Sequence, residues 1–170
     1  MTPTAPGTIE LERFLPYRLS VLTNLVSGTI ADAYRRRFDL SIPEWRVLAV
    51  LARHPGLSAA EVAERTRMDA VAVSRAVARL LAAGRLRRGL ARDDRRRSVL
   101  AVSAAGRAVY RAVAPMALGY EKELLAALDP AARDALDAAL GALIARAEAL
   151  AGSVAAGEAG RRGRRRGARR

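Results

Sequence analysis

Residues 58–106 combine two short helices with a basic hairpin, and this stretch constrains the fold more than any other part of the chain. The run Ser58-Ala59-Ala60-Glu61 matches the capping box, whose first and fourth residues satisfy free backbone N–H groups at a helix start. Asp69 is a good N-cap for a second helix over residues 69–83, and Gly84 can adopt the left-handed conformation that ends it. Two short helices joined by so tight a turn predict a helix–turn–helix.

A hairpin over residues 85–102 is expected after the second helix. Seven arginines lie between Arg85 and Arg97 against only two aspartates, and the hairpin closes with the strand-like run Ser98-Val99-Leu100-Ala101-Val102. A small core does not require such a charge. The pattern predicts two short strands around a basic turn, which form a wing beside the helix–turn–helix.

A long helix is predicted before this unit. Apolar residues recur at steps of three and four from about Glu10 to Phe38, and they line one face. This helix is longer than a small core can cover, so we expect part of its apolar face to meet a second subunit. A shorter helix over residues 44–53 follows Pro43, which suits a first helical turn.

Two more helices are predicted after the hairpin. The first runs from Ser103 to about Leu128, with a kink or break at Pro115, and the second covers residues 131–150. The expected fold class is therefore mainly α. It is a winged helix–turn–helix with a small two-stranded β-wing, plus long helices that form a helical dimerisation region.

The charge of the chain indicates its partner. Thirty lysines and arginines stand against 17 aspartates and glutamates, which gives a formal net charge of +13. Such a balance points to a polyanion or an anionic surface. Nucleic acid is the first interpretation and an anionic membrane the second. Since no stretch of about 20 residues is free of charge, we expect no membrane span.

Several classes of function lack the residues that they need. Without cysteine there is no disulfide, thiolate nucleophile or cysteine-based zinc site. The one histidine, His54, lies beside a proline in a turn, and the sequence has no phosphate loop or HExxH motif. We therefore expect no enzyme, metal or cofactor. Residues 1–8 do not look like a signal peptide, so we expect a cytoplasmic, nucleoid-associated protein.

The second helix of the pair is predicted to enter the major groove of DNA. Recognition helices contact base edges through their N-terminal part. Arg75 can give two hydrogen bonds to a guanine, and Ser74 can donate or accept one. The alternative is that Arg75 is only a solvated surface charge. The expected contact residues of this helix are Ala70, Val71, Ser74, Arg75 and Arg79.

The wing is predicted to contact phosphates and the adjacent minor groove. Basic side chains gain affinity by releasing counterions from phosphates, and one arginine can enter a narrow minor groove. The carboxylate of Asp94 can orient the guanidinium of Arg96 or of Arg79. The alternative is a flexible charged turn without a fixed partner. The expected contact residues of the wing are Arg92, Asp94, Arg95, Arg96 and Arg97.

The C-terminal run of residues 161–170 is arginine-rich and of low complexity, so we expect it to be disordered. Its seven arginines supply about half of the net charge, and they could bind DNA without regard to sequence. The alternative is a dispensable solvated tail. The expected regions are a flexible N-terminus (1–8), the helical dimerisation region (9–40 and 103–150), the winged helix–turn–helix DNA-binding domain (41–102) and a disordered arginine-rich tail (151–170).

Residues from about 11 to 150 resemble the MarR family of bacterial transcription regulators. Two positions depart from the family pattern: Arg85 stands where an aliphatic residue is usual, and Ala70 where lysine is frequent. The order of the elements also agrees with the family. The residues that carry the resemblance are Asp69, Val73-Ser74-Arg75, Leu80, Gly84, Asp94-Arg95-Arg96 and Leu100-Ala101-Val102-Ser103-Ala104-Ala105-Gly106.

The resemblance implies that Arg96 enters the minor groove with Asp94 as its partner. It also implies a two-fold homodimer that reads an inverted repeat, and a small aromatic or anionic effector bound between the dimer helices and the DNA-binding lobe. The alternative for the aromatic residues is an ordinary core or surface role. The residues that could line the effector pocket are Tyr17, Arg18, Tyr34, Trp45 and Arg46.

These patterns together predict a MarR-like DNA-binding transcriptional regulator, taken as a repressor, that binds an inverted-repeat operator as a homodimer. The recognition helix 69–83 would lie in the major groove and the wing 85–102 at the minor groove, with release by a small ligand. The alternative function is a non-specific or architectural nucleic-acid-binding protein.

Overall fold

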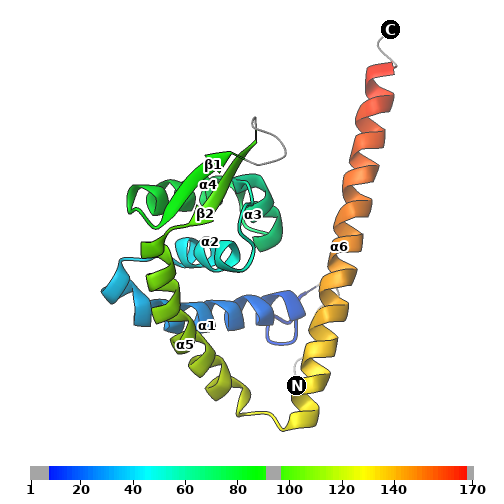
Figure 1. Ribbon diagram of the computed structural model, residues 1–170. Coiled ribbons are helices and arrows are strands. Elements are labelled where there is room, and N and C mark those ends of the chain that lie inside the picture. Colours follow the sequence, from blue (N-terminus) through cyan, green and yellow to red (C-terminus); the bar gives the residue numbers. More distant parts are fainter. Residues whose placement is uncertain (1–7, 91–96, 168–170) are drawn as a thin grey trace. The chain divides into compact units, whose positions relative to one another are not determined.

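The computed structural model describes residues 8–90 and 97–167, with side chains as far as residue 153. Helices and a two-stranded sheet make up the described part (Figure 1). The elements are α1 (Leu15–Phe38), α2 (Ile42–Arg53), α3 (Ala59–Thr66), α4 (Ala70–Ala82), β1 (Leu86–Leu90), β2 (Ser98–Val102), α5 (Ala104–Leu125) and α6 (Pro130–Gly167). The predicted fold class, a mainly helical winged helix–turn–helix, is confirmed.

The chain forms two compact units, Met1–Tyr120 and Glu121–Arg170. The first unit holds α1 to α4, the sheet and most of α5. The second holds the end of α5 and all of α6. None of the helices in the described ranges is both long enough and apolar enough to span a membrane.

The first unit has a hydrophobic core of its own, with α2 at its centre. Helix α2 contacts α1, α3, α4 and β2, as Figure 1 also shows. Full burial of an aliphatic side chain stabilises a fold by about 1.5–3 kcal/mol, so a core of this size can hold the winged domain together. The fully or nearly fully buried side chains include Ala31, Tyr34, Leu40, Val47, Leu48, Leu51, Val62, Val73, Val77, Leu80, Leu86, Leu100, Val102 and Val113.

The two strands form an antiparallel hairpin, as the sequence predicts. Leu86 pairs with Val102 at the open end and Leu90 with Ser98 toward the turn. The second edge of β2 is also covered. The N–H of Gly56 donates to the carbonyl of Leu100 at 3.0 Å, and the N–H of Leu100 donates to that of Leu57 at 2.8 Å. These bonds tie the wing to the loop before α3 and leave no open strand edge there.

The prediction for the first helix was wrong at its start. Helix α1 begins at Leu15 rather than at Glu10. Pro16 explains the difference, because it has no N–H to donate and therefore fits the first turn of a helix better than its interior. The residues from Glu10 to Phe14 form a separate turn, in which the N–H of Phe14 donates to the carbonyl of Glu10 at 2.9 Å.

The two C-terminal helices also differ from expectation. Pro115 lies inside α5, and the helix continues on both sides of it. Helix α6 extends to Gly167, whereas the sequence predicted an end at Leu150 and a disordered tail from residue 151. No proline occurs after Pro130, and the extension is rich in alanine and arginine, which have high helix propensity. The glycines of this stretch had suggested an end that the backbone does not make.

Candidate nucleic-acid interface

Helix α4 is positioned by its cap and by one buried face. The carboxylate of Asp69 accepts hydrogen bonds from the N–H groups of Val71 and Ala72, both at 3.0 Å. This confirms Asp69 as the N-cap. Gly84 has a φ of +65° just beyond the C-terminus, as predicted. The residues of α4 that pack into the core are Val73, Ala76, Val77 and Leu80.

The first two turns of α4 present a free surface on their other side. Four predicted contact residues, Ala70, Val71, Ser74 and Arg75, are all exposed there, and Val71 keeps 55% of its accessible surface. We call these four residues the recognition surface. Within the described residues, the side chains of Ser74 and Arg75 have no hydrogen-bond or ion-pair partner. Their donors are therefore available to a ligand without breaking an internal contact.

Arg79, the fifth predicted contact on this helix, has a different environment. Its Nε lies 3.2 Å from Oε1 of Glu44, and its Nη2 lies 3.9 Å from Oδ2 of Asp39. The Glu44 side chain is only 3% exposed, whereas that of Arg79 is 63% exposed. The pair therefore links the C-terminal half of α4 to the start of α2. This contact favours a positioning role for Arg79 over a base contact.

Glu44 also caps α2, which the sequence analysis missed. Its Oε2 accepts hydrogen bonds from the N–H of Ser41 at 2.7 Å and from the Ser41 hydroxyl at 2.5 Å. Ser41 and Glu44 form a full capping box. The signal was present, because Ser41-Ile42-Pro43-Glu44 has the same serine-to-glutamate spacing as the box that was recognised at Ser58 and Glu61.

Arg85, which departs from the family pattern, anchors the start of the wing. Its guanidinium donates to the backbone carbonyl of Phe38 and, at 3.5 Å, to that of Asp39. An aliphatic side chain could not make these bonds to the end of α1. We call Asp39, Glu44, Arg79 and Arg85 the junction cluster, because together they join α4 and the wing to the segment between α1 and α2.

The open end of the hairpin is closed by Ser103 and Gly106. The Ser103 hydroxyl donates to the carbonyl of Gly84 at 2.6 Å, and its N–H donates to the carbonyl of Arg85 at 3.0 Å. A Cβ on Gly106 would lie 2.1 Å from that same carbonyl oxygen. Helix α5 therefore approaches the start of β1 so closely that only glycine fits at this position.

The base of the wing is held by an ion pair with α3. Nη1 of Arg97 lies 3.1 Å from Oε1 of Glu61 and 3.4 Å from Oε2. Hydrogen bonds from the backbone and side chain of Ser58, together with the charge of Arg97, hold the pKa of Glu61 below its usual value. The other wing residues predicted to contact DNA, Arg92, Asp94, Arg95 and Arg96, lie outside the described residues.

The residues expected to line an effector pocket fall into two groups. The rings of Tyr34 and Trp45 lie 5.9 Å apart, and Arg46 donates to the hydroxyl of Ser27 at 3.2 Å. Burial raises the pKa of Tyr34. Tyr17 and Arg18 are exposed near the start of α1. Tyr17 precedes Tyr34 by about 25 Å of helix, so within one chain it cannot line the same small pocket.

The aromatic pair continues into α5, which the sequence did not predict. The ring of Tyr110 stacks on Trp45 with centroids 5.7 Å apart. Tyr34, Trp45 and Tyr110 therefore join three helices through one row of rings. This arrangement supports the core interpretation for Tyr34 and Trp45. In the ranges that the structure describes, no group of three or more histidines or acidic residues is placed to hold a metal ion.

Comparisons with known proteins agree with this geometry. The model of the MarR family matches residues 38–97. A search of curated proteins found no match. A MarR family transcriptional regulator from Silicibacter pomeroyi is 25% identical, with a TM-score of 0.70 over 81% of this chain and 92% of that chain.

Two further solved structures share the fold. A MarR/EmrR family transcriptional regulator from Acinetobacter sp. ADP1 is 24% identical, with a TM-score of 0.76 over 82% of this chain and 99% of that one. MepR of S. aureus, solved as a complex with DNA, is 17% identical, with a TM-score of 0.71 over 79% and 96%. The family match and the shared fold together show that the chain belongs to the MarR family of winged helix–turn–helix transcriptional regulators.

Proposed function

We propose that the protein is a sequence-specific DNA-binding regulator whose recognition surface enters the major groove. The observation that carries the proposal is the exposed first half of α4, where Ser74 and Arg75 have no internal partner among the described residues. Free donors at the N-terminal end of a docked helix are what base reading requires. The arginines of the wing would contact phosphates and the adjacent minor groove.

Selection of bound sequences from a random DNA pool tests the proposal. We expect an enriched inverted repeat with half-sites about 10 base pairs apart, bound at least about a thousandfold more tightly than random DNA. Equal binding to all sequences would instead support the alternative function of an architectural nucleic-acid-binding protein. The same pool bound by an Arg75→Ala variant shows whether α4 reads the enriched bases.

We further propose that the protein acts as a homodimer through its outer helices. Apolar side chains at helical spacing stay exposed on both: Leu15, Leu19, Leu22 and Leu25 on α1, and Leu136, Leu140, Leu143 and Leu150 on α6. A monomer rarely leaves so much apolar surface in water. A two-fold dimer would bury it and would present two recognition surfaces to an inverted repeat.

Sedimentation equilibrium measures this association. We expect a dimer at micromolar concentrations and a monomer for the double variant Leu140→Asp and Leu143→Asp, because two charges would have to be buried in the interface. Ala60→Asp, at an exposed position of α3, is the matched control and should remain dimeric. A wild-type protein that is monomeric at all concentrations would contradict the proposal.

Repression and release by a small ligand belong to the same proposal. One structural relative is described as having its DNA binding regulated by 6-hydroxynicotinic acid, and it shares 22% identity with this chain. A repressor bound to an operator in the cytoplasm would lower expression of a reporter gene placed behind the selected sequence. Increased expression on adding the protein would identify an activator instead.

The arginine-rich C-terminus would add affinity without adding specificity. Each phosphate contact contributes roughly 0.9 to the slope of log affinity against log salt, so deletion of residues 160–170 should reduce that slope by several of these increments. Binding to all DNA sequences should weaken together. Loss of preference for the selected operator after the deletion would contradict this role.

A further inference from the structure

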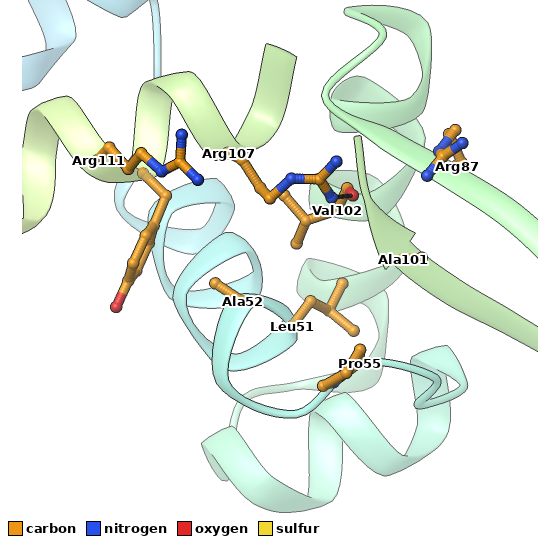
Figure 2. A pocket seen from close by; sticks show the side chains of 9 residues that line it. Leu51, Ala52, Pro55, Arg87, Ala101, Val102, Arg107 and Arg111 are labelled. Atoms are coloured by element: carbon orange, nitrogen blue, oxygen red, sulfur yellow. Dashed lines mark hydrogen bonds between the residues drawn. The ribbon is translucent and has the colours of Figure 1, made fainter. Parts of the chain in front are cut away.

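A pocket of about 420 Å³ lies between the C-terminal half of α2, the wing strands and the first half of α5 (Figure 2). It does not include the residues that the sequence analysis expected to line an effector site. It also includes no residue of α3 or α4. It is therefore separate from both the recognition surface and the row of rings on its α1 side, although Tyr110 contributes to its wall.

Three arginines converge on this pocket. Arg107 and Arg111 are one helical turn apart on α5, and Arg87 comes from β1 (Figure 2). Nη1 of Arg107 donates to the carbonyl of Val102 at 2.7 Å, which fixes the direction of its guanidinium. Arg87 and Arg111 have no hydrogen-bond or ion-pair partner within the described residues. No acidic residue lines the pocket, so the three positive charges are not neutralised there.

The rest of the lining is apolar. Leu51, Ala52 and Pro55 come from α2 and the loop after it, and Ala101 faces the pocket from β2. Ala101 is the direct cross-strand partner of Arg87, so both lie on the same face of the hairpin. Small-molecule sites have this composition, with an apolar wall and a few convergent polar groups, and volumes of roughly 300–1,000 Å³.

We propose that this pocket binds a small organic anion, with its acidic group held by Arg87, Arg107 and Arg111 and an apolar ring against α2 and β2. Guanidinium groups bind carboxylates and phosphates through paired hydrogen bonds, which orients the anion. A DNA backbone would satisfy the arginines but would leave the apolar wall in water. Such a ligand would connect a wing strand to α5.

Titration calorimetry on the full chain without DNA tests the site. The probes are benzoate and phenyl phosphate, which combine a ring with an acidic group. Benzamide, which keeps the ring without the charge, and inorganic phosphate, which keeps a charge without the ring, are the ligand controls. We expect both ring-bearing anions to bind one site per chain, at least about tenfold more tightly than either control.

The double variant Arg87→Gln and Arg111→Gln should weaken binding of benzoate and phenyl phosphate by about tenfold or more. Arg36→Gln removes an exposed arginine of α1 outside the pocket and should change binding less than twofold. Circular dichroism of the double variant checks that the fold is kept.

Three results would overturn the proposal: no saturable binding of either ring-bearing anion, equal binding of inorganic phosphate, or unchanged binding by the folded double variant. Binding at the pocket needs no DNA. Failure here would therefore leave the proposed DNA-binding function standing, and failure of operator selection would leave the pocket proposal standing.

Discussion

Arg75 and Arg79 lie one turn apart on α4, and the structure gives them opposite roles. Arg75 belongs to the recognition surface and has no partner among the described residues. Arg79 belongs to the junction cluster and is paired with the buried carboxylate of Glu44 at 3.2 Å. Both arginines are exposed to solvent. Exposure alone therefore does not identify a residue that contacts DNA, and the partner of each guanidinium has to be known.

The two groups also differ in what they stabilise. The junction cluster connects α4 and the wing to the segment between α1 and α2, so its loss should loosen the fold. The recognition surface makes no such connection, so its loss should affect only what binds to it. The experiments below separate these two effects, and they begin with the largest.

Gly106→Ala should cause the largest loss of stability. Its Cβ would lie 2.1 Å from the carbonyl oxygen of Arg85, and neither backbone can move freely. We expect a cost of about 3 kcal/mol in the free energy of unfolding, measured by urea denaturation. Gly119→Ala on the same helix meets nothing within 4 Å and should gain about 0.5–1 kcal/mol from helix propensity. Equal effects of the two substitutions would contradict the close approach of α5 to β1.

Arg75→Ala should change DNA recognition without changing stability. We expect a loss of about 1–3 kcal/mol in discrimination at one position of each half-site, because a bidentate contact to a guanine would be removed. Fluorescence anisotropy with operator and mutated operators measures it, and the unfolding midpoint should stay at the wild-type value. Equal losses on every DNA sequence would show that Arg75 contacts only phosphate.

Arg79→Ala should do the reverse. It leaves the Glu44 carboxylate without its cation, and because Arg79 is largely exposed we expect a modest cost of about 1 kcal/mol in the free energy of unfolding. DNA affinity should fall by a similar factor on all sequences. A double-mutant cycle with Glu44→Gln should show coupling between the two positions. Unchanged stability with relaxed base preference would return Arg79 to the recognition surface.

The smallest expected effect concerns acid and the base of the wing. Because the pKa of Glu61 is lowered in the folded state, its contacts stabilise the fold above the unfolded pKa of about 4.3 and are lost as the pH falls through the folded value. Acidification below about pH 4 should therefore weaken the Arg97–Glu61 contact. Hydrogen exchange of β2 amides should detect this, and Glu61→Gln should remove that part of the pH dependence.

Local signals in the sequence predicted local structure well. The capping box at Ser58, the Asp69 cap and the left-handed Gly84 all depend on residues within four positions of one another, and all three are confirmed. Where a local signal was overlooked, the prediction failed. Pro16 marks the true start of α1, and Ser41 with Glu44 marks that of α2.

The sequence by itself determined the fold class, the order of the elements and the family, because helix caps, apolar periodicity and a basic hairpin are properties of neighbouring residues. It did not assign roles to individual arginines. Arg79 meets Glu44, Arg85 meets Phe38 and Arg97 meets Glu61 across about 35–47 residues of chain. Arginines look alike in a sequence, and only tertiary packing decides which carboxylate or carbonyl each can reach. The same packing brought Arg87, Arg107 and Arg111 to one pocket.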